Sequence, residues 1–447
     1  MRRLSPVCSR AVLFVLLLAS TGSVASSVPD QALELNRRGV EHLDKKEYDA
    51  AVKSFRDAIK IKPDYSDALD NLGKALDAEG KPAEAVRDFK KVIKLAPDNA
   101  IAHNDMGRAL FHEKKYQESA AAYRQALAVH SDYPEAYNGL GAALLQSGQT
   151  DEAISAFEKA AKLDPKNVDA FNNAGAALVG KQRGSEAIPY LVTALQLKPD
   201  APDILENYGH ALHQAGRNEE AAATYQKIVN QHPNDAAAWA ALGQFQYADK
   251  KYNDAEASLR KSLELNPHQA EACFTLGAAY HEQGKSGEAV QAYEKGLASK
   301  PNDADALYNL GVSHQAQKEY DKAAASFHKA LKARSNFPEA LAGLAACQLS
   351  TNKVDDAIAT YKKAIAAQPA DPNLRFNLAG ALFNKGDFKG AAENYRETAK
   401  LKPDFAHAYY NLAMSLLRLN DNSGAQTAFA EAHRLDPSLQ PPAMASK

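Results

Sequence analysis

The sequence of 447 residues predicts an all-α solenoid of helix–turn–helix repeats. Three observations predict this fold class. A pattern of 34 residues runs twelve times from Ala32 to Leu439 without insertion or deletion. Within it, apolar residues at positions 4, 7, 8 and 11 and again at 20, 21, 24, 27 and 28 have the spacing of two amphipathic helices. Glycine or asparagine at position 15 of seven repeats tolerates the left-handed backbone that ends a helix.

Three residue types mark the phase of the repeat, which starts at residues 32, 66, 100, 134, 168, 202, 236, 270, 304, 338, 372 and 406. Proline stands at position 32 of ten repeats, alanine at position 20 of eleven, and a large apolar or aromatic residue at position 24 of all twelve. Glycine stands at position 8 of nine repeats, from Gly39 to Gly311. Because glycine inside a helix costs about 1 kcal/mol against alanine, we expect it to let the position-24 side chain approach closely.

At these residues the chain resembles the tetratricopeptide repeat (TPR) family, whose pattern is W-x2-L-G-x2-Y, then A-x3-F, then P. The only tryptophan, Trp239, occupies the tryptophan position of that pattern in repeat seven. The fourth repeat shows the rest of the pattern as Tyr137, Leu140, Gly141, Leu144, Ala153, Phe157 and Pro165. The resemblance implies a right-handed superhelical α-solenoid of about 24 helices, in which the first helix of each repeat lines a concave groove.

Residues 1–25 have the pattern of a secretory signal peptide. Three arginines and no acid precede or flank the apolar run from Ala11 to Ala19, and Ser23-Val24-Ala25 forms a small-x-small cleavage site. The run is too short for a bilayer-spanning helix of about 20 residues; an uncleaved anchor is the alternative. We therefore expect export to a periplasm or secretion, with residues 26–31 as a short linker and 440–447 as a flexible tail.

Composition excludes several classes of function. The formal net charge of −2 argues against general binding of nucleic acid, which depends on neutralising phosphates. Cys273 and Cys347 lie two repeats apart, too far to bridge. The sequence has no HExxH, GxSxG or glycine-rich phosphate loop. We predict no catalytic residues, no metal and no cofactor.

The groove positions implied by the resemblance are 2, 5, 6, 9, 12 and 13, and asparagine recurs at position 6. Its amide can both donate to and accept from a peptide main chain, and the series looks like the asparagine ladder in the TPR region of O-GlcNAc transferases. The alternative is a partly structural residue typical of the family. The residues are Asn71, Asn173, Asn207, Asn309, Asn377 and Asn411.

Two further groove positions have a pattern. Position 2 is acidic in seven repeats, among them Asp169, Asp203 and Asp305, which predicts a preference for basic partners or only a favourable helix dipole. Position 5 is polar in repeats one to six, whereas four of the last six repeats carry an aromatic ring there. We expect these rings either to anchor apolar side chains of a partner or to pack on the adjacent helix. They are Phe274, Tyr308, Phe376 and Tyr410.

These patterns predict a non-enzymatic scaffold or adaptor that holds an extended peptide or a partner protein in its concave groove, in an exported compartment. The first alternative is an architectural or assembly factor of a cell-envelope complex that uses other faces. The second is a sugar-binding or enzymatic role of groove carboxylates. No nucleic acid and no membrane span is expected, and the sequence does not fix an oligomeric state.

Overall fold

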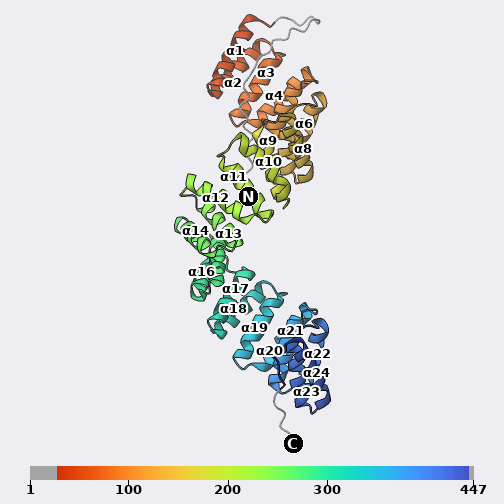
Figure 1. Ribbon diagram of the computed structural model, residues 1–447. Coiled ribbons are helices and arrows are strands. Elements are labelled where there is room, and N and C mark those ends of the chain that lie inside the picture. Colours follow the sequence, from red (N-terminus) through yellow and green to blue (C-terminus); the bar gives the residue numbers. More distant parts are fainter. Residues whose placement is uncertain (1–27, 442–447) are drawn as a thin grey trace. The chain divides into compact units, whose positions relative to one another are not determined.

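The computed structural model describes residues 28–441 (Figure 1). Within that range the regular structure consists of 24 α-helices, and no strand occurs there. The predicted all-α repeat array is therefore confirmed for the described residues. The predicted signal peptide, residues 1–25, and nearly all of the predicted tail lie outside them. The chain divides into two compact units, with the boundary between Ile228 and Val229.

The N-terminal unit holds eleven complete helices among its described residues, and α12 (Asn218–Gln231) contains the boundary. Its helices are α1 (Asp30–Asp44), α2 (Tyr48–Ile61), α3 (Ser66–Ala78), α4 (Pro82–Leu95), α5 (Ala100–His112), α6 (Tyr116–Val129), α7 (Pro134–Gln146), α8 (Thr150–Leu163), α9 (Val168–Gly180), α10 (Gly184–Leu197) and α11 (Pro202–Gln214).

The C-terminal unit continues the same alternation. Its helices are α13 (Ala236–Ala248), α14 (Tyr252–Leu265), α15 (Ala270–Glu282), α16 (Ser286–Ser299), α17 (Ala304–Ala316), α18 (Tyr320–Ala333), α19 (Pro338–Ser350), α20 (Val354–Ala367), α21 (Pro372–Lys385), α22 (Phe388–Leu401), α23 (Ala406–Arg418) and α24 (Asn422–Leu435). Odd-numbered helices other than α1 begin at repeat position 1, and even-numbered helices begin at position 17.

The turn inside each repeat depends on one residue in the left-handed conformation. All twelve residues at position 15 have a positive φ, including Lys114 (62°) and Lys318 (61°) as well as Gly148 (84°). The following amide then reaches back to close the helix end, as when Gln149 N donates to Leu144 O at 2.9 Å. The sequence marked this position only where glycine or asparagine occupies it; lysine and glutamine adopt the same conformation in the other repeats.

The contact between positions 8 and 24 holds the two helices of a repeat together. A Cβ atom added at Gly141 would lie 2.7 Å from Cδ1 of Phe157, and one added at Gly73 would lie 2.7 Å from Cε1 of Phe89. Both rings are fully buried. The close approach inferred from the glycines is thus what the structure shows, and it explains why a poor helix former stands inside the first helix.

Successive odd-numbered helices touch one another directly from α1 to α11 and from α13 to α19, whereas neighbouring even-numbered helices make no comparable contact. The even-numbered helices from α2 to α10 and from α14 to α22 pack instead on the odd-numbered helices before and after them. The odd-numbered helices therefore form the more closely spaced layer. We call positions 2, 5, 6, 9, 12 and 13 on α1 to α11 the N-terminal wall, and the same positions on α13 to α23 the C-terminal wall.

Candidate functional site

Asparagine amides in the N-terminal wall bind each other across neighbouring helices. Position 6 of one repeat donates to position 5 of the preceding repeat. The bonds run from Asn71 Nδ2 to Asn36 Oδ1 at 3.2 Å, from Asn173 Nδ2 to Asn138 Oδ1 at 3.1 Å, and from Asn207 Nδ2 to Asn172 Oδ1 at 2.9 Å. Asn173 and Asn207 are buried. These three predicted groove residues therefore join adjacent helices, which is the structural role that the sequence left open.

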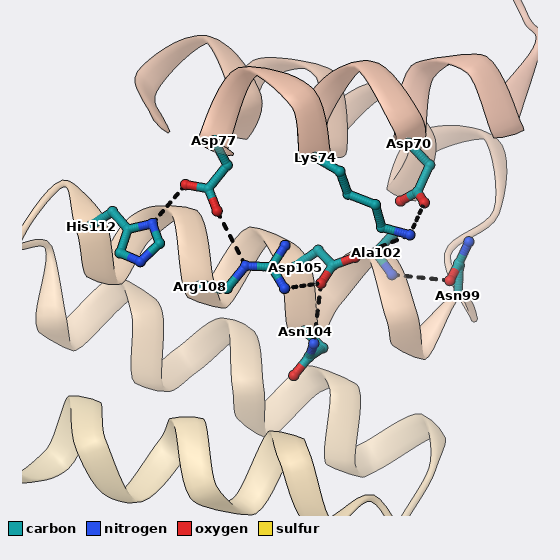
Figure 2. Close-up of polar contacts among 9 residues, drawn as sticks. All are labelled: Asp70, Lys74, Asp77, Asn99, Ala102, Asn104, Asp105, Arg108 and His112. Atoms are coloured by element: carbon teal, nitrogen blue, oxygen red, sulfur yellow. Dashed lines mark hydrogen bonds and ion pairs between the residues drawn. The ribbon is translucent and has the colours of Figure 1, made fainter. Parts of the chain in front are cut away.

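A chain of charged side chains joins α3 to α5 in the same wall (Figure 2). Lys74 Nζ lies 2.6 Å from Asp70 Oδ2 on its own helix and 3.5 Å from Asp105 Oδ2 on the next. Arg108 Nη1 lies 3.0 Å from Asp105 Oδ1. The Asp105 carboxylate, on a residue only 3% exposed, is thus held between a lysine and an arginine.

At the other end of this series of charged side chains, Asp77 binds Arg108 and His112. Arg108 Nε donates to Asp77 Oδ2 at 3.1 Å, and His112 Nδ1 lies 2.7 Å from Asp77 Oδ1 (Figure 2). Asp77 is buried, whereas the His112 side chain is partly exposed. The wall at α3 and α5 therefore holds alternating charges that neutralise one another rather than a patch of one sign.

The surroundings move the pKa values of the two outer carboxyls in opposite directions. Burial raises the pKa of Asp70, and the charge of Lys74 only partly offsets it. Burial acts the same way on Asp77, but the hydrogen bond from His112 and the positive charge of Arg108 outweigh it, so the pKa of Asp77 is lowered. Burial lowers the pKa of Lys74, yet the facing carboxylates Asp105 and Asp70 raise it above its ordinary value.

Aromatic rings take the place of these polar contacts in the C-terminal wall. The Tyr308 ring lies 5.1 Å from Phe337 and 5.8 Å from Phe327 between centroids. The Phe376 ring lies 4.8 Å from Phe405 and 5.4 Å from Tyr395. Such distances are those of packed aromatic pairs. The predicted packing on neighbouring side chains therefore occurs, while both rings keep part of their surface exposed.

The two other predicted rings behave alike. Tyr410 lies 5.4 Å from Phe429 in an edge-to-face arrangement, and Phe274 fills the space beside Gly296, where an added Cβ atom would lie in contact with its ring. All four position-5 rings are partly buried. Each therefore supports its own repeat and also presents an edge to the wall.

A groove opens in the C-terminal wall across α17, α19 and α21. It has a volume of about 380 Å³. Its floor is made of small residues on α19, Ala342, Gly343 and Ala346, and it is bounded by Tyr308 on α17 and Asn377 on α21. Two of the predicted groove residues therefore meet at one cavity, with side chains small enough between them to admit a group from a partner.

The three position-6 asparagines of the C-terminal wall differ from those of the N-terminal wall. Asn309 and Asn377 make no side-chain hydrogen bond within residues 28–441, because the preceding repeat offers Phe274 or Ala342 where the N-terminal unit offers an amide. Asn411 is hydrogen-bonded to Tyr395. Asn377 is exposed. Its amide is therefore free to meet a peptide main chain.

The predicted acidic residues at position 2 fall into two groups. Asp305 forms a bidentate pair with Arg334 at 2.9 and 2.6 Å, at the exposed junction of α17 and α18. In the N-terminal wall, Asp169 and Asp203 lie on successive inner helices, and Asn172 Nδ2 donates to Asp203 at 3.4 Å. Burial and the charge of Asp203 raise the pKa of Asp169. Asp305 thus stabilises its own repeat, whereas the other two place charge along the wall.

Residues 28–441 show no sign of a metal, redox or membrane-spanning site. No cluster of three or more metal-ligating side chains occurs there. Cys273 and Cys347 are free and buried, and burial raises the pKa of the Cys347 thiol to about 11. No helix in this range is both long enough and apolar enough to cross a membrane.

Comparison with known protein families decides the family. Profiles described as "Tetratricopeptide repeat" match residues 36–100, 71–128, 114–168, 178–245, 236–269, 314–382 and 376–439, and one described as "TPR repeat" matches 277–318. The chain belongs to the tetratricopeptide repeat family. The TPR fold is typical of protein–protein interaction scaffolds and is generally non-catalytic. No curated protein matches the sequence of this TPR chain.

Several solved structures are similar to this TPR protein. The APC/C hetero-tetramer Cut9–Hcn1 is 14% identical, covers 91% of this chain and 94% of its own, and gives a TM-score of 0.41. YrrB, described as a TPR protein with an unusual peptide-binding site, is 26% identical over 41% of this chain and 95% of its own, with a TM-score of 0.39. A MamA protein is 28% identical over 38% of this chain and 93% of its own, with a TM-score of 0.35.

The charged chain on α3 and α5 of this TPR protein was missed by reasoning from sequence. Its members stand at wall positions 5, 6, 9, 12 and 13 of two successive repeats. A signal existed, because Lys74 and Arg108 are the only lysine and arginine at position 9. Asp77 and Arg108 are 31 residues apart, which places them on neighbouring odd-numbered helices. Comparing wall positions between neighbouring repeats, rather than along one position, would have found it.

Proposed function

We propose that this protein is a non-enzymatic adaptor that binds an extended peptide segment or partner protein in the groove of α17, α19 and α21. The observation that carries the proposal is the cavity of about 380 Å³ between Tyr308 and Asn377. An aromatic edge and a small-residue floor suit an apolar side chain of a partner. The free amide of Asn377 suits the adjacent main chain, because it both donates and accepts.

The charges at the groove indicate the kind of peptide. Glu339 and Asp371 line it, and no basic side chain does. A segment in which a bulky apolar residue is followed by a lysine or arginine would complement both the floor and the acidic edge. The N-terminal wall is a weaker candidate for the same role, because its asparagines and charged residues already bind one another.

The test is a selection of random linear peptides displayed on phage against the full chain, followed by affinity measurements on two groove variants. Ala342→Phe fills the floor with the residue that repeats eight and eleven carry at the same position. Asn377→Ala removes the amide. We expect each to weaken the selected peptides by about tenfold without lowering the melting temperature, while Lys389→Ala on α22 leaves affinity unchanged. Peptides that bind the Ala342→Phe chain as tightly as the wild type would disprove groove binding.

We also propose that the chain acts in an exported compartment. Support comes from the basic, apolar and small-residue pattern of residues 1–25. Fusion of residues 1–31 to alkaline phosphatase, which is active only where disulfides form, should give an active reporter. N-terminal sequencing of the mature protein should begin after Ala25. An inactive, uncleaved fusion would contradict the proposal.

A further inference from the structure

One cavity of the C-terminal unit lies between two even-numbered helices, away from the wall. α16 and α18 both pack on α17 but make no comparable contact with each other. Between them lies a cavity of about 810 Å³, with Leu297, Leu307 and Leu310 among its lining residues. None of its lining residues stands at a wall position, so this cavity is separate from the proposed peptide groove.

Two lysines of α18, Lys329 and Lys332, stand beside this apolar floor. Both are exposed, and within residues 28–441 neither forms an ion pair with a carboxylate. Glu294 is the only acidic residue that lines the cavity. The cavity therefore combines an apolar interior with a rim of two lysines that form no ion pair within the described residues and one glutamate.

Lys329 belongs to a row that continues along the unit. Position 26 is lysine in four consecutive repeats of the C-terminal unit, and all four are exposed; the first of them, Lys261, is paired with Glu264 at 3.4 Å. They are Lys261 on α14, Lys295 on α16, Lys329 on α18 and Lys363 on α20. Lys295 also lines a second cavity of about 450 Å³ between α14 and α16, so the arrangement of apolar hollow and lysine recurs one repeat earlier.

The helix dipole does not account for this row. A dipole favours cations in the last turn of a helix, which covers Lys332 near the end of α18 at Ala333. Lys329 precedes that turn, as do its equivalents on the other three helices. The dipole therefore gives no reason for lysine at this position, which Lys91, Lys159 and Lys227 also occupy in the N-terminal unit.

In a similar cavity of the N-terminal unit, most of the basic side chains at the rim are paired with acidic ones. It lies between α2 and α4, has a volume of about 500 Å³, and is also lined by leucines and bases. Here, however, three of the bases are paired with acids: Arg56 with Glu84 at 2.9 Å, Lys60 with Asp57 at 2.7 Å, and Lys91 with Asp88 at 2.6 Å. The rim between α2 and α4 is thus largely neutralised, whereas Lys329 and Lys332 beside the cavity between α16 and α18 form no ion pair within residues 28–441.

We propose that the cavity between α16 and α18 docks an acidic segment of a partner protein. An aliphatic side chain of that segment fills the hollow over Leu307 and Leu310, and its carboxylates bind Lys329 and Lys332. The inner groove, whose edge is acidic, suits the opposite kind of peptide, so one protein would hold two different partners.

The test uses the full chain and two fluorescein-labelled peptides, acetyl-Asp-Glu-Leu-Leu-Asp-Glu-amide and its uncharged counterpart acetyl-Asn-Gln-Leu-Leu-Asn-Gln-amide. Fluorescence anisotropy should show saturable binding of the acidic peptide and at least about tenfold weaker binding of the other. Affinity should also fall as NaCl rises from about 20 to 500 mM, because the rim is exposed.

Two variants distinguish the contribution of the lysine charge to peptide binding from that of the apolar cavity. Lys329→Glu should weaken the acidic peptide by about tenfold, and Ala298→Phe, which fills the cavity without changing charge, should weaken both peptides. Lys389→Glu makes the same charge change on α22 and serves as the matched control, while Ala342→Phe in the inner groove should have no effect. Circular dichroism melting confirms that each variant is folded.

Three results would overturn the proposal. The first is an absence of saturable binding of the acidic peptide to the wild-type chain. The second is equal weakening by Lys389→Glu and Lys329→Glu, which would indicate only net charge. The third is displacement of the peptide by single-stranded oligothymidine at equal concentration, which would indicate a general anion site rather than a protein-docking site.

Discussion

The two units are built from the same 34-residue repeat, but the polar side chains of their walls have different partners. In the N-terminal wall, Asn173 and Asn207 bind amides of the preceding repeat, and Asp105 lies between two cations. In the C-terminal wall, rings such as Tyr308 stand at position 5, where the N-terminal wall has the accepting asparagines, and Asn377 has no partner within the described residues. The difference teaches that wall residues of a repeat array either join helices to one another or remain available to a partner.

The largest expected effect is a loss of folding stability when the central carboxylate of the N-terminal wall, Asp105, is removed. Asp105→Ala leaves Lys74 and Arg108 facing each other without the carboxylate between them. Because removing the central carboxylate of a buried charge network leaves its two cations compensated only by Asp70 and Asp77, we expect a loss of about 3 kcal/mol. Urea unfolding measures the loss, and hydrogen exchange should show it centred on α3 and α5. A change below about 1 kcal/mol would mean that the charged chain is no more than a surface feature.

The second prediction concerns the contact that both units share. Gly141→Ala would place a Cβ atom 2.7 Å from the Phe157 ring. We expect a loss of about 2 kcal/mol, because overpacking outweighs the gain in helix propensity. The last three repeats already carry alanine at this position, as at Ala379. Ala379→Gly is the matched variant and should also destabilise, by about 1 kcal/mol. A stabilised Gly141→Ala protein would show that the ring moves aside without cost.

The comparison between the walls is sharpest at the asparagines. Asn173→Ala removes a buried donor and leaves Asn138 Oδ1 without it, so we expect a loss of about 1.5 kcal/mol. Asn377→Ala removes an exposed, unpaired amide and should change stability by less than about 0.5 kcal/mol. Chemical denaturation of the two variants measures both values. Equal losses would remove the distinction between a joined wall and an open one.

The turns should behave alike in both units. Lys114 and Lys318 hold a positive φ that costs a side-chain-bearing residue about 1 kcal/mol. Lys114→Gly and Lys318→Gly should therefore each stabilise by up to about 1 kcal/mol, measured by thermal melting. Opposite signs in the two units would indicate that the difference between them extends beyond the walls.

The smallest expected effect concerns pH: two carboxyls of the N-terminal wall, Asp70 and Asp77, should change the stability of the fold in opposite directions as pH rises. The pKa of Asp70 is raised, so its ionised form destabilises the fold; Asp70→Asn should gain stability relative to wild type as pH rises through that pKa. The pKa of Asp77 is lowered, so its ionised form stabilises the fold. Asp77→Asn should be weaker than wild type above the ordinary value of 3.8, and the deficit should vanish as pH falls through the lowered pKa. Thermal melting between about pH 2 and 7 checks both signs.

The helices of each repeat and the packing between them were predictable from the sequence, because they depend on residues close together along the chain. Apolar spacing predicted two helices per repeat, and glycine at position 8 predicted the close approach of the position-24 ring. The partners of the wall residues were not predicted, because Asn173 and Asn138 are 35 residues apart and meet only through the stacking of repeats. The same holds for Arg108 and Asp77. The groove at Tyr308 and Asn377 needed the three-dimensional view for a different reason, since its floor is defined by small residues that carry no signal of their own.

Every substantial helix–helix contact within either unit joins helices that are adjacent or next but one along the chain. Tension applied to the two termini would therefore be resisted by repeats in series and not by distant contacts acting together. Such a protein should lengthen stepwise in an optical trap, with each step releasing roughly 110 Å of extended chain for one repeat. Steps involving the N-terminal unit should need the larger force, because hydrogen bonds between amides and ion pairs join its neighbouring odd-numbered helices.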